Sequence, residues 1–144
     1  MAKRRRAKKT MLGGKAAEFV ARERVCRVAT VGDGVVPHLV PVCHVLSGGK
    51  LYFGSGDDAR KVLNLKANPR VAVTVDLYSD HWASLKGVMV QGAVRLIERG
   101  PRFQSVRKLL YAKYPQYPRE AAISPSDSVI VEVTPTHVFT WGFE

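Results

Sequence analysis

The stretch GSGDDARKVLNLKANPR, Gly54–Arg70, links a predicted strand to a predicted helix and guides the interpretation of the whole chain. The helix is expected from about Asp58 to Ala67, because the chain then reaches Pro69, which disfavours helix in the residue before it. Asp57 and Asp58 are expected to cap its start, where the helix dipole favours negative charge. The stretch therefore predicts a strand, a tight glycine-containing turn and a capped helix.

Arg60 and Lys61 fall in the first turn of this predicted helix, where each cation opposes the dipole at a cost of about 0.3–1 kcal/mol. A bound phosphate would reverse that sign, because free backbone N–H groups and two cations all favour an anion. The preceding Gly54, Ser55 and Gly56 would let it approach the backbone and would add a hydroxyl. Alternatively, both cations point into water and the neighbouring aspartates neutralise them. This stretch alone leaves both interpretations open.

Apolar residues that alternate with polar ones predict about seven short antiparallel strands over most of the chain. The strands are expected at 25–31, 35–46, 50–55, 70–78, 87–98, 128–133 and 137–143, with the last two split at Thr134 and Pro135. Three helices are expected, and the first and last carry apolar stripes at helical spacing: Phe19 and Val20, then Phe103, Val106, Leu110 and Tyr114. The pattern predicts a mainly β fold (α+β), a small antiparallel barrel of six to seven strands with peripheral helices.

The second predicted strand contains Pro37 and Pro41, which cannot donate backbone hydrogen bonds to a neighbouring strand. It is therefore expected to leave one edge unpaired. Solvent or a flat ligand would lie along that edge.

Length and charge define the domain organisation. The chain has 144 residues and is expected to form one domain, residues 15–144, preceded by a basic disordered arm, residues 1–14. Net charge is +11, and six Lys and Arg residues lie in residues 1–9, which contain no acid, so weak nucleic-acid contact is expected from the arm alone. No apolar run is long enough to span a membrane, and we expect a soluble cytoplasmic protein.

No acid–base pair, nucleophile or metal site is expected from residue spacing. Cys43 and His44 are neighbours in a strand and point to opposite faces, which excludes a thiol–imidazole pair. His38 and His44 share a face without a third ligand, so zinc is not expected. Cys26 and Cys43 are expected to be reduced thiols.

Four motifs are spread along the chain: Gly34 with Pro37 and Pro41, the Arg-Lys pair before NLKANPRVAV, the Gln-Gly of GVMVQGAVRLIE, and a terminal VFTWGF. Together they resemble the pyridoxamine 5′-phosphate oxidase-like family of split β-barrels. The resemblance covers nearly the whole chain after residue 15. It implies an FMN-binding split barrel, a homodimer with the flavin at the subunit interface, and hydride transfer by FMN or by the deazaflavin coenzyme F-420.

The resemblance also implies cofactor-binding residues, and no catalytic side chain. Arg60 and Lys61 match the phosphate-contacting pair, with Ser55 nearby. The remaining contacts are the ribityl neighbours Phe53 and Gly54, the backbone of Val42 and Cys43 along the ring edge, Gln91 from the long strand, and Trp141 beside the ring. Trp82 and Lys86 would belong to the other subunit's site. The C-terminus lacks the Arg and His pattern of a true pyridoxamine phosphate oxidase.

The favoured function is thus an FMN-dependent oxidoreductase acting on a small molecule. An F-420-dependent reductase is the alternative, since the longer acidic tail of that cofactor would need further cations, for which Arg70, Lys86 and Arg95 are available. Two hypotheses from other classes stay open: a flavin-binding or storage protein without turnover, and a basic small-barrel nucleic-acid binder. The nucleic-acid hypothesis requires aromatic residues among cations on an exposed sheet.

Overall fold

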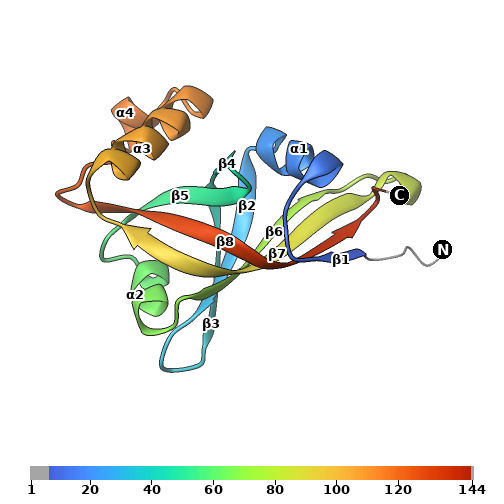
Figure 1. Ribbon diagram of the computed structural model, residues 1–144, viewed down its shortest axis with the longest axis horizontal. Helices are drawn as coiled ribbons and strands as arrows, with labels where there is room; N and C mark the ends of the chain where they lie inside the picture. Colours follow the sequence, from blue (N-terminus) through green and yellow to red (C-terminus); the bar gives the residue numbers. More distant parts are fainter. Residues whose placement is uncertain (1–6, 144) are drawn as a thin grey trace.

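The computed structural model describes residues 7–143, which form one curled antiparallel sheet surrounded by short helices (Figure 1). The strands follow the order β3-β2-β6-β7-β8-β5-β4, and β1 pairs with β8 outside this path. The strands are β1 (Ala7–Lys9), β2 (Val25–Val31), β3 (Pro37–Cys43), β4 (Val45–Ser47), β5 (Lys50–Gly56), β6 (Arg70–Leu77), β7 (Lys86–Ile97) and β8 (Ser128–Trp141). The helices are α1 (Gly14–Arg22), α2 (Arg60–Ala67), the 3-10 helix η1 (Trp82–Ser84), α3 (Pro101–Lys113) and α4 (Tyr117–Glu120). The predicted mainly β split barrel with peripheral helices is confirmed.

Two hydrophobic clusters lie on opposite faces of the sheet. The first fills the barrel and includes Phe19 and Val20 of α1 together with inward residues of β2, β5, β6, β7 and β8. The second lies under α3 and includes Phe103, Val106 and Leu110, as the predicted stripe requires. Both predicted apolar stripes are therefore confirmed. None of the described helices is long and apolar enough to cross a membrane.

β8 joins the two sides of the barrel. It pairs with β7 along most of its length, with β5 through residues 128–133 and with β1 through residues 138–140. The predicted division into two strands is wrong, because Pro135 lies at a register shift opposite Gly92, where a bulge accommodates a residue without an N–H group. The hydroxyl of Thr136 donates to the carbonyl of Gln91 at 3.1 Å and closes this bulge.

His44 breaks the strand predicted at 35–46 into β3 and β4. Its Nε2 donates to the carbonyl of Val20 at 2.7 Å, and its Nδ1 is buried with no hydrogen-bond partner among the described residues. The hydroxyl of Tyr114, which caps the C-terminus of α3, accepts a hydrogen bond from the N–H of His44 at 2.9 Å. Burial lowers the pKa of His44 to about 4, so the ring is neutral at pH 7. These contacts fasten α1 and α3 to the β3–β4 junction.

The structure differs from the expected disordered arm over residues 7–14. Residues Ala7–Lys9 form β1, which pairs with residues 138–140 of β8, and Leu12 is buried in the barrel core. The ordered domain therefore begins before residue 15. The rest of the predicted arm, residues 1–6, lies outside the described residues.

Candidate functional site

The chain enters α2 through a turn that contains the two aspartates. The helix begins at Arg60, and Ala59 occupies the cap position without a side-chain hydrogen bond. The prediction that Asp57 and Asp58 cap the helix is therefore wrong. The N–H of Asp57 donates to the carbonyl of Asp127 at 3.0 Å, and this tertiary contact holds the aspartates outside the helix.

Arg60 and Lys61 lie in the first turn of α2, as predicted, and because the helix begins at Arg60 they are its first two residues. No acidic residue lies in that turn. Among the residues that the structure describes, neither side chain forms an ion pair or a hydrogen bond. Their backbone N–H groups likewise have no acceptor within residues 7–143, as expected for the first turn of a helix. The helix start thus presents two cations and two N–H donors to an anion.

The two cations differ in their surroundings. Arg60 is exposed, whereas Lys61 is partly buried, and this burial lowers its pKa below the usual lysine range. A desolvated ammonium without a counter-ion is destabilised, and an anion beside it would offset that cost. Lys61 is thus better suited to a bound anion than to free solvent.

A groove of about 580 Å³ lies between α2 and the turn that joins β2 to β3. Arg60 and Asn64 line its α2 side, and Gly32, Asp33 and His38 line the opposite side. The Nδ1 atom of His38 is buried and has no partner among the described residues. The sequence analysis considered His38 only as a zinc ligand and did not expect zinc there. The groove provides space beside one of the two cations.

Val42 and Cys43 lie at the end of β3, which is an edge strand paired with β2, as the two prolines predicted. The side chain of Val42 packs against the barrel core, and that of Cys43 packs against the second cluster. Both side chains are partly buried by these contacts, and the backbone of the two residues runs along the edge of the sheet. Their contact with a flavin stays a prediction.

Phe53, Gly54 and Ser55 lie on β5, directly before the turn that leads to α2. Phe53 is buried in the barrel core. A Cβ at Gly54 would lie 2.9 Å from Cδ1 of Ile123, so the missing side chain makes room for Ile123. The hydroxyl of Ser55 donates to the carbonyl of Gly56 at 3.0 Å. Of these three residues, only Ser55 therefore offers a polar side-chain group.

Gln91 and Trp141 lie on the outer face of β7 and β8, apart from the two α2 cations. Gln91 is the register partner of His137 and lines a second groove of about 690 Å³ together with Arg70. Trp141 is the register partner of Gly87, and a Cβ at Gly87 would lie 2.2 Å from Cζ2 of its indole. The structure therefore divides the predicted site residues between two faces of the chain.

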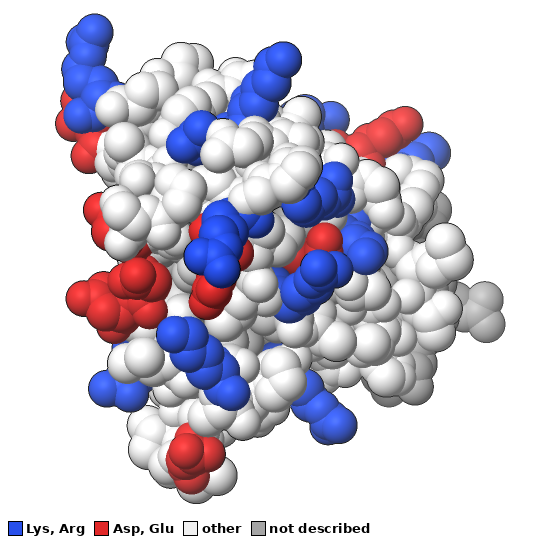
Figure 2. Space-filling view, turned by 60° about the vertical axis from the view of Figure 1, so that its left-hand side comes forward, with Lys and Arg blue, Asp and Glu red and all other residues white. Residues whose placement is uncertain are grey.

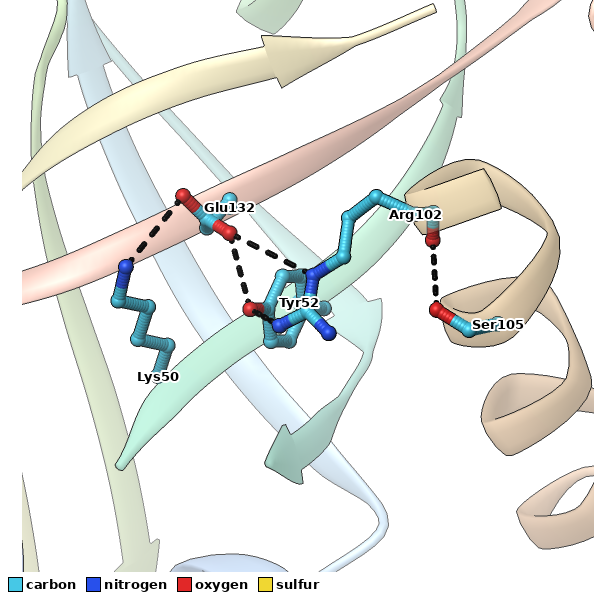
Figure 3. A network of polar contacts seen from close by, with 5 residues as sticks. All are labelled: Lys50, Tyr52, Arg102, Ser105 and Glu132. Carbon is cyan, nitrogen blue, oxygen red and sulfur yellow. Dashed lines mark hydrogen bonds and ion pairs between the residues drawn. The ribbon is translucent and has the colours of Figure 1, made fainter. Parts of the chain in front are cut away.

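A polar network around the buried residues Tyr52 and Glu132, which the sequence analysis did not identify, lies between β5, β8 and α3 (Figure 3). The hydroxyl of Tyr52 donates to Oε2 of Glu132 at 2.9 Å, and Arg102 hydrogen-bonds to the same hydroxyl. Lys50 and Arg102 also form ion pairs with Glu132, at 3.7 Å and 3.9 Å. Strand alternation alone places Glu132 on the same face as apolar residues, so only the position of α3 could have shown its partners. The network attaches α3 to the sheet.

Charged side chains do not gather into one basic surface on the face shown in Figure 2. Basic side chains lie at separate places there, with acidic ones between them. Basic residues at positions 3–6 lie outside the described residues. This face therefore lacks the continuous basic patch that nucleic-acid binding favours.

Comparisons with known proteins agree on a fold. A family model described as pyridoxamine 5′-phosphate oxidase matches residues 12–142. None of the curated proteins is similar enough to match the chain.

Similar solved structures include a FAD-binding protein from Mesorhizobium loti, with 23% identity, a TM-score of 0.73, and coverage of 94% of this chain and 96% of that one. An F-420 reductase has 24% identity, a TM-score of 0.70, and coverage of 88% and 97%. The heme storage protein HutZ from Vibrio cholerae has 17% identity, a TM-score of 0.76, and coverage of 92% and 96%. Identities this low support the shared fold alone.

Proposed function

We propose that this chain, which belongs to the pyridoxamine 5′-phosphate oxidase family, binds FMN and acts as a flavin-dependent oxidoreductase on a small molecule. The observation that carries the proposal is the start of α2, where Arg60 and Lys61 have no ion pair with any described residue. FMN ends in a single phosphate, which suits two cations and two free N–H groups. The residues present therefore fit this cofactor.

Each part of the chain has a distinct role in this proposal. Arg60 and Lys61 bind the phosphate, and Ser55 adds a hydroxyl near the end of β5. The free edge of β3 at Val42 and Cys43 orients the ring through backbone groups. When bound, the flavin supplies the hydride-transfer chemistry, so the protein needs no nucleophile of its own. In this proposal the residues of the chain bind the flavin and orient its ring.

We further propose that a second copy of the chain covers the outer face of the sheet. Leu39 on β3 is 66% exposed, and Tyr78 and Trp82, near the β6–β7 connection, are 67% and 54% exposed. Large exposed apolar side chains of this kind favour an interface. In such a dimer the outer-face residues Gln91 and Trp141 would serve the partner's cofactor. Sedimentation analysis should find a dimer for the wild type and a monomer for Leu39→Glu, and a wild-type monomer would contradict this assignment.

A deazaflavin is the second candidate, favoured by one specific observation. Arg70 lines the groove of about 690 Å³ with Gln91 and His137, where it would meet a longer acidic tail. The other two cations considered for that tail are placed less well: Lys86 lies 5.7 Å from the ring of Phe143, and Arg95 is the register partner of Glu132. Loss of F-420 binding in Arg70→Ala, with FMN binding absent in the wild type, would favour this candidate.

The experiment that tests the proposal is a titration of the purified protein with FMN and with riboflavin, which lacks the phosphate. Flavin fluorescence reports binding. Each lost charge-assisted hydrogen bond is worth roughly 1.5–3 kcal/mol, so Arg60→Ala with Lys61→Ala should weaken FMN binding about 100-fold or more. Riboflavin binding should not change. The control, Lys66→Ala with Lys108→Ala, removes the same charge from exposed helix positions.

Two further outcomes distinguish the other classes of function. Turnover of the bound flavin with a nicotinamide reductant supports an enzyme, whereas binding without turnover supports a storage role. A Soret absorption band after addition of heme, with no flavin binding, would favour heme binding of the kind named for the HutZ protein. Absence of FMN binding by the wild type would contradict the main proposal.

A further inference from the structure

We propose that Thr30 and Asn64 are positioning residues that set the orientation of α2, and with it the affinity of Arg60 and Lys61 for a phosphate. This inference rests on the function proposed above. It concerns residues that lie away from the anion itself and act through the helix that carries the two cations.

A hydrogen bond between buried side chains joins α2 to β2. Nδ2 of Asn64 donates to Oγ1 of Thr30 at 3.0 Å. Asn64 is 6% exposed and Thr30 is 1% exposed, so the hydrogen bond lies largely out of contact with water. A buried amide left without its partner is unfavourable, and the pair therefore defines one preferred position of the helix.

The other side of the Asn64 carboxamide rests on Gly32. A Cβ at Gly32 would lie 2.5 Å from Oδ1 of Asn64, so a larger residue there would displace the amide. Gly32 begins the turn between β2 and β3, directly after the strand that contains Thr30. The amide is thus held between the strand end and the turn.

The geometry of α2 transmits this contact to the cations. Asn64 follows Arg60 by four residues, so both lie on the same side of the helix, and both line the groove of about 580 Å³. The opposite side of that groove is the β2–β3 turn that begins at Gly32. One polar contact thus fixes both sides of the groove beside Arg60.

Apolar residues in place of Thr30 and Asn64 would also pack α2 against the barrel. Val62 and Leu65 already provide buried apolar anchors on α2. An eight-residue helix is marginal alone and takes its position from tertiary contacts. A hydrogen bond has directional requirements that apolar contact lacks, and it is therefore the contact that orients the first turn.

The test compares FMN with riboflavin in three variants. Thr30→Val keeps the volume and removes the hydroxyl, so FMN affinity should fall about tenfold while riboflavin affinity does not change. Thr30→Ser keeps the acceptor and should retain wild-type FMN affinity. Thr30→Val with Asn64→Leu replaces both partners by apolar groups, which is often neutral for stability.

The double variant separates orientation from stability. Thr30→Val should lower the melting temperature, because it leaves the buried Asn64 amide without its partner. We expect the double variant to have the wild-type melting temperature and an FMN affinity about tenfold below that of the wild type. Recovery of FMN affinity together with the melting temperature would overturn the positioning role. Unchanged FMN affinity in Thr30→Val would overturn the positioning role but would leave the proposed function intact. A wild type that binds no FMN would overturn the proposed function and this inference together.

Discussion

Replacing Tyr52 with phenylalanine removes one hydroxyl from the network in Figure 3 and should destabilise the protein by about 1.5–3 kcal/mol. The hydroxyl donates to Oε2 of Glu132 at 2.9 Å, and both residues are buried. Burial and the neighbouring carboxylate raise the pKa of Tyr52, so its proton remains in place to donate.

The two cations of the network should not compensate for the lost hydroxyl. Lys50 and Arg102 lie 3.7 Å and 3.9 Å from the Glu132 carboxylate, with side chains 41% and 50% exposed. Ion pairs of such exposure contribute about 0–1 kcal/mol each. The hydrogen bond from Tyr52 is therefore the dominant contribution.

Thermal and urea unfolding measure this effect. For a chain of this length, 1 kcal/mol corresponds to about 2–4 °C, so Tyr52→Phe should lower the melting temperature by about 3–12 °C without changing the urea m-value. Tyr78→Phe is the matched control, because Tyr78 is exposed, and it should have no measurable effect. An unchanged melting temperature in Tyr52→Phe would refute the assignment of the stabilisation to this hydrogen bond.

Two further predictions concern stability and packing. The free energy of unfolding should fall by about 2 kcal/mol from pH 7 to pH 5, because His44, with its pKa lowered to about 4, stays neutral in the folded state while the unfolded chain takes up a proton near pH 6.5. His44→Gln should flatten this dependence in urea titrations at the two pH values, and an equal fall in that variant would contradict the assignment. Gly87→Ala should displace the indole of Trp141, lower stability by about 1–3 kcal/mol and shift tryptophan emission. Gly34→Ala, where a Cβ would meet no atom within 4 Å, is the control, and equal effects in both glycine variants would argue against the contact.

Local signals in the sequence predicted the position of the two cations correctly. The stop at Pro69 and the helical spacing placed Arg60 and Lys61 in the first turn of α2, and the structure agrees. The cap was wrong because Asp57 is held by the carbonyl of Asp127, far away along the chain. Such a partner leaves no mark in the local pattern.

Strand boundaries show the same limit. Pro135 indicated a break, yet β8 accommodates it with a bulge at Thr136, opposite Gln91 and Gly92 of β7, and continues. β1 was missed because its basic sequence resembles a solvated arm and its partner strand lies at the other end of the chain. The predicted site residues lie on two faces of the chain, a separation that the order of residues along the sequence does not reveal.

The central position of β8 has a consequence for biosynthesis. Residues 128–141 lie between β7 and β5 in the sheet, so a nascent chain that has not reached them has no strand to join its two halves. Until then, β5 has β4 as its one strand neighbour in the described sheet, and the edges of β5 and β7 are unpaired. The two halves of the sheet can therefore join only after β8 has begun to leave the ribosome, and a nascent chain stalled before β8 would expose strand edges that favour aggregation.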